Sequence, residues 1–165
     1  MRQCFVFAIV LVCFASSCSK EADPSRKFVS FQLDSLVVLS ENPTAILTAA
    51  NLTDTDPDND YPSLKITGTG NHNETITFTL ISETDSLRTG SYPSTQRGNG
   101  MAISYTESNS TLLADNTNGS LTFDIGDVQD STIECYFVGS LVDTTGVLSN
   151  RQVTNGFIRA VVKRN

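Results

Sequence analysis

The sequence contains no tryptophan, a single histidine (His72) and only four cysteines. Zinc sites are built from clusters of histidine and cysteine, and a serine triad needs a histidine beside a carboxylate and a hydroxyl. Neither arrangement is evident, because His72 stands alone in a polar segment between two apolar runs. Glycosidases use a pair of carboxylates, and the 18 acidic residues allow many such pairs, but the sequence singles out no particular pair. We therefore expect no enzymatic activity and no catalytic residues.

Basic residues are also scarce, with 11 Lys and Arg against 18 Asp and Glu and a formal net charge of −7. Phosphate backbones and anionic lipid surfaces attract proteins of the opposite charge. Nucleic acid is therefore not an expected partner.

Long hydrophobic runs are absent except at the N-terminus, where apolar residues extend from Phe5 to Ala15. Arg2 precedes this run and two serines follow it, which is the order of an export signal. The run is shorter than the roughly 20 residues that a membrane-spanning helix needs. We expect residues 1–17 to be a removable signal peptide.

The segment from Ala15 to Cys18 resembles the lipobox of bacterial lipoproteins, in which small residues precede a cysteine that is diacylated before cleavage. Residues 19–23 resemble the short tether of lysine and acidic residues in surface-exposed lipoproteins of Bacteroidota. The resemblance implies that Cys18 carries lipid, that 18–27 form a flexible tether, and that the membrane is a partner through this anchor. It places the protein in the cell envelope, at the outer membrane. The alternative is an ordinary secretory signal, with Cys18 incidental.

The cysteines do not predict a disulfide framework. Cys4 and Cys13 lie in the expected signal peptide and Cys18 is assigned to lipid, so Cys135 remains alone. Cys135 alternates with Glu134 and Tyr136 in an apolar segment. We predict that it points into a core as a small hydrophobic residue.

From residue 28 onward, apolar residues recur with a period of two and are interrupted by Gly, Asn, Asp and Ser, as in antiparallel all-β domains. The clearest segment runs from Thr75 to Leu80. The pattern predicts one domain over 28–165, an antiparallel two-sheet sandwich or flattened barrel of about ten strands. Further strands are expected at Val29–Leu33, Leu64–Ile66, Met101–Tyr105, Leu121–Ile125, Ile133–Leu141 and Phe157–Val162.

Residues that favour tight turns separate these segments. They lie at 34–35, 70–73, 116–119 and 143–146, where Gly and Asn accept a positive φ. The segment from Thr44 to Leu52 could form two or three helical turns, but its Ile and Thr also suit a strand. We favour the strand.

Several short stretches, in order along the chain, resemble small Bacteroidota lipoproteins built around an all-β domain of unknown function. The resemblance implies a β-sandwich on a lipid tether and supplies no catalytic residues. The stretches are Phe31–Leu36, Leu64–Gly68, Ile76–Leu80, Thr89–Tyr92, Gly119–Phe123 and Val153–Phe157.

An acidic loop offers the one candidate metal site. Asp54, Asp56, Asp58 and Asp60 alternate with other residues and supply the hard oxygen ligands that Ca²⁺ prefers. The loop lacks the glycine and the bidentate glutamate of a helix-loop-helix calcium site. The alternative is a solvated connection between strands. A calcium-binding β domain is accordingly one of the functions considered.

A glycan site would use exposed aromatic rings with amide side chains beside them. Without tryptophan, the candidates for ligand binding are Tyr61 and Tyr92 as platforms, with Gln96 and Asn99 as polar partners. Tyr105 alternates with Ile103 and is expected in the core.

The sequence as a whole predicts a lipid-anchored envelope protein that acts as a binding or structural module. An envelope protein or a glycan would be its partner. The alternative is a surface carbohydrate-binding accessory of a nutrient uptake system.

Overall fold

The computed structural model describes residues 26–53, 55, 59–82, 84, 86–129 and 131–165, and these form eleven strands and no helix. The all-β prediction is therefore confirmed. No helix among the described residues is long and apolar enough to cross a bilayer. The strands are β1 (Phe28–Leu33), β2 (Leu36–Glu41), β3 (Thr44–Thr48), β4 (Ser63–Thr69), β5 (Thr75–Ile81), β6 (Gly90–Pro93), β7 (Gly100–Tyr105), β8 (Ser110–Ala114), β9 (Ser120–Gln129), β10 (Thr132–Asp143) and β11 (Arg151–Arg164).

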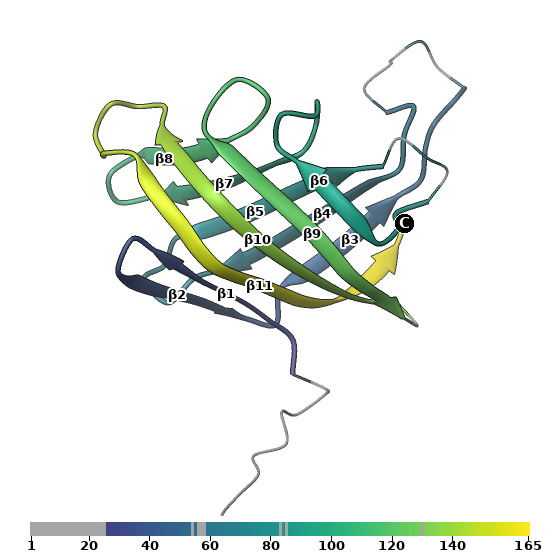
Figure 1. The fold of residues 1–165 in the computed structure, drawn as a ribbon, viewed down its shortest axis with the longest axis horizontal. Helices are drawn as coiled ribbons and strands as arrows, with labels where there is room; N and C mark the ends of the chain where they lie inside the picture. Colours follow the sequence, from purple (N-terminus) through teal and green to yellow (C-terminus); the bar gives the residue numbers. More distant parts are fainter. Residues whose placement is uncertain (1–25, 54, 56–58, 83, 85, 130) are drawn as a thin grey trace, which may run out of the picture.

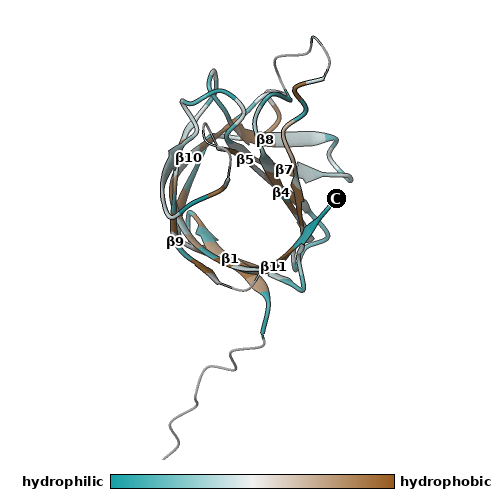
Figure 2. Ribbon diagram, turned by 90° about the vertical axis from the view of Figure 1, so that its right-hand side faces the viewer, coloured by the Kyte–Doolittle hydropathy of each residue, from teal (hydrophilic) through white to brown (hydrophobic). Residues whose placement is uncertain are grey.

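The strands form two layers (Figure 1). Strand pairs at the borders of these layers join them into one hydrogen-bonded sheet. One layer has the order β2-β1-β11-β10-β9-β6, and the other has the order β3-β4-β5-β7-β8. The last residues of β11 pair with β3, and the last residues of β10 pair with β8. β10 and β11 thus pass from the first layer into the second. Figure 2, turned by 90°, shows the strands surrounding a central region.

All strand pairs are antiparallel except β11 with β3, which is parallel. The expectation of an antiparallel sheet is corrected at this pair. β2 is antiparallel to β1, which is itself antiparallel to β11, so β2 runs in the direction of β11. Only Asn42 and Pro43 separate β2 from β3, and Asn42 adopts a φ of 51°. This corner moves the chain to the other layer without reversing it, and β3 therefore arrives parallel to β11.

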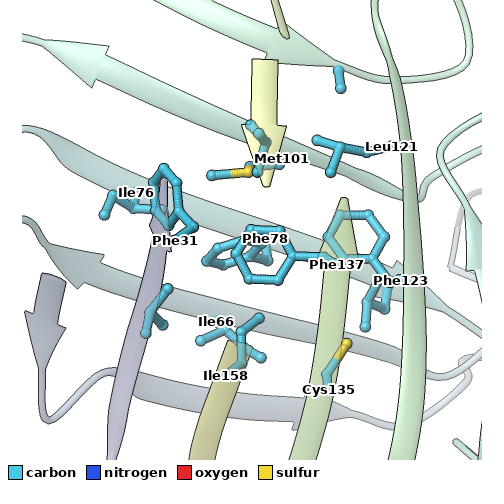
Figure 3. Close-up of a cluster of buried hydrophobic side chains, with 14 of the residues drawn as sticks. Phe31, Ile66, Ile76, Phe78, Met101, Leu121, Phe123, Cys135, Phe137 and Ile158 are labelled. Carbon is cyan, nitrogen blue, oxygen red and sulfur yellow. The ribbon is translucent and has the colours of Figure 1, made fainter. Parts of the chain in front are cut away.

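The core lies between the layers. It is built from the side chains that point inward, which are every second residue along most strands. Its centre is a cluster of four phenylalanines (Figure 3). The ring of Phe137 lies with its centroid 5.6 Å from that of Phe31, 5.1 Å from Phe78 and 6.0 Å from Phe123. Phe31, Phe123 and Phe137 come from the first layer and Phe78 comes from the second. These rings therefore hold the two layers together.

The predicted turns are confirmed by the backbone. Asp34, Asn73, Gly119 and Gly146 adopt φ values of 54°, 63°, 61° and 73°, the left-handed region that tight turns use. The segment 44–52 forms a strand only from Thr44 to Thr48. The preference for strand over helix is confirmed for that part.

We predict that Phe137→Ala lowers the free energy of unfolding by about 3–5 kcal/mol, because it removes a buried ring that contacts three others. Urea denaturation would measure the loss. The control is Tyr136→Ala on the outward side of the same strand, with an expected loss below about 1.5 kcal/mol. Equal losses for both variants would contradict the assignment of the core.

Candidate functional site

Most residues of the two predicted metal and lipid sites lie outside the described residues. These are Cys18 and the carboxylates Asp54, Asp56 and Asp58. Asp60 is described and half-buried. Among the described residues, no group of three or more His, Cys, Asp or Glu side chains is placed to hold a metal ion.

Tyr92 and Asn99, predicted as ligand-binding residues, are buried. The Tyr92 hydroxyl donates to the Arg88 carbonyl at 2.9 Å and accepts from the Arg88 N–H at 3.1 Å. The Asn99 amide oxygen accepts from the Ile81 N–H at 2.7 Å, and its nitrogen donates to the Pro93 carbonyl at 3.2 Å. Both side chains satisfy buried backbone groups. The prediction of Tyr92 as a surface platform and of Asn99 as its polar partner is corrected here, because both side chains are buried and hold loops in place.

The other two predicted ligand residues are not joined into a platform either. The Gln96 side chain is half-buried, and its oxygen accepts from the Asn99 amide nitrogen at 3.2 Å. Tyr61 is 47% exposed and lies two residues before the start of β4. Tyr105, expected in the core, is half-buried and packs against the core.

The ionisable side chains His72, Glu74, Tyr105 and Glu107 line a cavity of about 380 Å³ where the β4–β5 and β7–β8 turns meet. The buried Glu74 carboxylate accepts from the His72 N–H at 2.9 Å, and its other oxygen lies 4.0 Å from His72 Nδ1. Burial, and then the Glu74 charge, raise the pKa of Tyr105. A Cβ on Gly70 would lie 2.2 Å from the Glu74 carboxylate. The Glu74 side chain therefore occupies the space beside Gly70 and accepts a hydrogen bond from the backbone of the same turn.

A row of aromatic rings crosses the outer face of the first layer, on three neighbouring strands. We define the aromatic row as Phe28 on β1, Phe157 on β11 and Tyr136 on β10. Ring centroids lie 5.5 Å apart between Phe28 and Phe157, and 5.0 Å apart between Phe157 and Tyr136. Tyr136 is 57% exposed and the nearby Val138 is 52% exposed. Exposed apolar groups gathered on one face mark an interaction surface.

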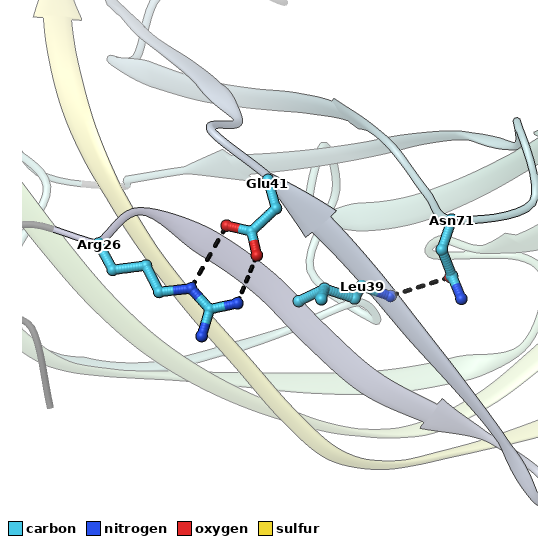
Figure 4. Close-up of polar contacts among 4 residues, drawn as sticks. All are labelled: Arg26, Leu39, Glu41 and Asn71. Carbon is cyan, nitrogen blue, oxygen red and sulfur yellow. Dashed lines mark hydrogen bonds and ion pairs between the residues drawn. The ribbon is translucent and has the colours of Figure 1, made fainter. Parts of the chain in front are cut away.

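Two arginines lie over rings of the aromatic row, one over Phe28 at its end and one over the central Phe157, and each is also paired with a glutamate. The Arg26 guanidinium is 5.0 Å from the centre of the Phe28 ring and is paired with Glu41 on β2 (Figure 4). The Arg159 guanidinium is 6.0 Å from the centre of the Phe157 ring, and its Nε donates to Glu134 at 2.7 Å. Cations over ring faces are stabilising. Two of the three rings thus carry a paired arginine over them.

Amide and hydroxyl groups lie next to the row on the same strands. The Asn155 amide nitrogen donates to the Gln32 amide oxygen at 3.1 Å, and the Thr154 hydroxyl lies 3.3 Å from that oxygen. All three side chains are exposed or half-buried. The outer face therefore combines aromatic rings with hydrogen-bonding groups.

The aromatic row was not predicted from the sequence, although part of the signal was present. Tyr136 lies between Cys135 and Phe137, both buried, and Phe157 precedes the buried Ile158. Alternation therefore indicates that each ring points outward. That the rings touch depends on the pairing of β1, β11 and β10, which are far apart in the sequence.

The prediction that Cys135 is a core residue is confirmed. Cys135 is fully buried on the inner face of β10. Burial raises the pKa of its thiol to about 12, with a smaller contribution from the negative charge of Asp124. The thiolate is the reactive form, so the side chain is poorly nucleophilic at neutral pH.

Comparison with protein-family models, with curated proteins and with solved structures finds no match to this chain. The interpretation of the aromatic row consequently depends on its geometry alone.

We predict that Cys135 resists thiol reagents at pH 8 while the protein is folded, because its pKa of about 12 keeps it protonated. A variant with serine at the other three cysteines isolates this thiol. Its modification by a chromogenic disulfide reagent is expected only after urea unfolds the protein. Rapid modification of the native protein would contradict the buried placement.

Proposed function

We propose that this protein is a lipid-anchored binding module of the cell envelope. The sequence from Arg2 to Cys18 supports export and acylation, and residues 18–27 would form the tether. The first strand begins at Phe28, directly after this tether. Two or three acyl chains would hold the protein at the membrane durably, since one chain alone binds only marginally.

We infer that the aromatic row is the binding surface, and that a glycan is its ligand. The observation that carries this inference is the contact of three rings on one outward face, with Tyr136 more than half exposed. The apolar C–H face of a sugar ring packs on such rings, and its hydroxyl groups need hydrogen-bond partners. Gln32 and Asn155 offer amide groups beside the row.

The charge of the molecule favours a neutral or weakly charged ligand over a polyanion. The whole chain carries a formal charge of −7. The two arginines at the row are already paired with Glu41 and Glu134, so they add little net positive charge. This balance fits a neutral glycan.

We predict that Tyr136→Ala weakens glycan binding about fivefold or more, since a ring contact contributes about 1 kcal/mol. Binding would be measured by titrating neutral oligosaccharides that an initial array selects. Tyr61→Ala is the matched control, because Tyr61 is also an exposed tyrosine but lies outside the row. Its affinity should equal that of the unmodified protein.

A second variant reports on the same surface by fluorescence. The chain has no tryptophan, so Tyr136→Trp would place its only indole in the row. Ligand binding should shift the emission of this indole to shorter wavelength. If no glycan binds but an envelope protein or a vesicle shifts the emission, the binding surface stands and the ligand class is wrong.

We predict that Cys18→Ser abolishes incorporation of labelled acyl chains and releases the protein from the envelope fraction. The reason is that the anchor would need the Cys18 thiol. Metabolic labelling and protease treatment of intact cells would measure both effects. Equal membrane association of the variant and the unmodified protein would contradict the anchor and leave the aromatic row untouched.

A further inference from the structure

Two adjoining cavities open where β3 and β11 end, and Leu47, Ser86 and Arg164 line both of them. Their volumes are about 400 Å³ and about 110 Å³. We call them together the Arg164 cavity. It lies at the end of the fold where the C-terminus is marked in Figure 1.

The walls of the Arg164 cavity are mainly apolar. They include Leu47 from β3, Ala50 from the segment that follows β3, Leu87, and Ile133 and Val162 from β10 and β11. Ile133 is fully buried, so the smaller cavity reaches the hydrophobic core. Pockets that are mostly apolar with few polar groups are typical of small-molecule sites.

Among the described residues that line the two cavities, Arg164 is the only one with a charged side chain. None of the ion pairs among the described residues includes it. In this respect Arg164 differs from Arg151 and Arg159, which are paired with Asp34 and Glu134. The described lining of the cavity therefore presents one cation, the exposed Arg164, with Ser86 and Ser131 nearby and mainly apolar walls.

The backbone around the cavity is held by hydrogen bonds across three segments. The Val162 N–H donates to the Ser131 carbonyl at 2.6 Å, and the Asn165 N–H donates to the Leu47 carbonyl at 3.2 Å. Arg164 itself is paired with Leu47 in the parallel ladder of β11 and β3. The backbone of Arg164 is thus fixed by strand pairing. A ligand would therefore have to order little of the chain on binding.

We propose that the Arg164 cavity binds a single-chain amphiphile with a carboxylate head, such as a medium-chain fatty acid. The hydrocarbon chain would lie along Leu47 and Ala50 in the larger cavity, with its end toward Val162 in the smaller one, and the carboxylate would pair with the Arg164 guanidinium. Each buried methylene contributes about 0.8 kcal/mol, so the chain supplies most of the affinity. A guanidinium matches a carboxylate in both charge and geometry. This site is separate from the aromatic row and does not depend on it.

The test uses decanoate and decanol, which share a chain and differ in the head group. The protein is the full chain with Cys18→Ser, which carries no acyl group of its own. The substitution Arg164→Gln is expected to weaken decanoate binding about fivefold and to leave decanol binding unchanged. Calorimetric titration would measure both affinities. Lys163→Gln is the matched control, because it removes the same charge from the neighbouring residue of β11. It should change decanoate affinity less than about twofold.

A blocking variant tests the location independently of charge. Ala50→Phe would fill the larger cavity from a residue outside the strands, and saturable binding of both compounds should be lost. In the protein without this change, decanoate should shift the methyl NMR signals of Leu47 and Val162. The proposal is overturned if decanoate does not saturate, if Ala50→Phe binds normally, or if Arg164→Gln weakens both compounds equally.

Discussion

The packing of the Phe137 side chain between the two layers is the contact on which the rest of the fold depends. Its ring touches those of Phe31, Phe78 and Phe123, so one side chain links both layers. The neighbouring strand must leave room for it. A Cβ on Gly156 would lie 2.6 Å from the Phe137 ring and 2.4 Å from its carbonyl oxygen. Any side chain at Gly156 would therefore displace the ring that joins the layers.

The same region determines how β10 and β11 bend from one layer to the other. Their register shifts between Phe137 and Gly139. Gly139 adopts a φ of 152°, and a Cβ there would lie 1.9 Å from the Ser120 carbonyl oxygen. A shift of this kind bends a strand and increases its twist. Beyond it β10 reaches β8. The Phe137 ring, Gly139 and Gly156 therefore act together. The glycines leave room for the ring and for the neighbouring backbone, and β10 bends toward the second layer beyond them.

Local features of this fold were predictable because they depend on neighbouring residues. Alternation marked the strand from Thr75 to Leu80, and Asn73 marked the turn before it. Features that depend on pairing were not predictable. Tyr92 was predicted to be a surface platform, yet it is buried and its hydroxyl donates to the Arg88 carbonyl inside the fold. The parallel pair of β11 with β3 follows from a corner whose direction the sequence does not specify. The row and the Arg164 cavity depend on the same long-range pairings.

Strand β11 carries both proposed binding sites, and its pairing explains why they are separate. Phe157 lies where β11 pairs with β1, and Arg164 lies where it pairs with β3. Seven residues of strand extend over about 23 Å, so a ligand at one site does not touch the other. Both segments are held by ladders on neighbouring strands, and a ligand changes a distant site only by favouring a different arrangement of the chain. A rigid shared strand offers no such alternative, and the two sites should therefore bind independently.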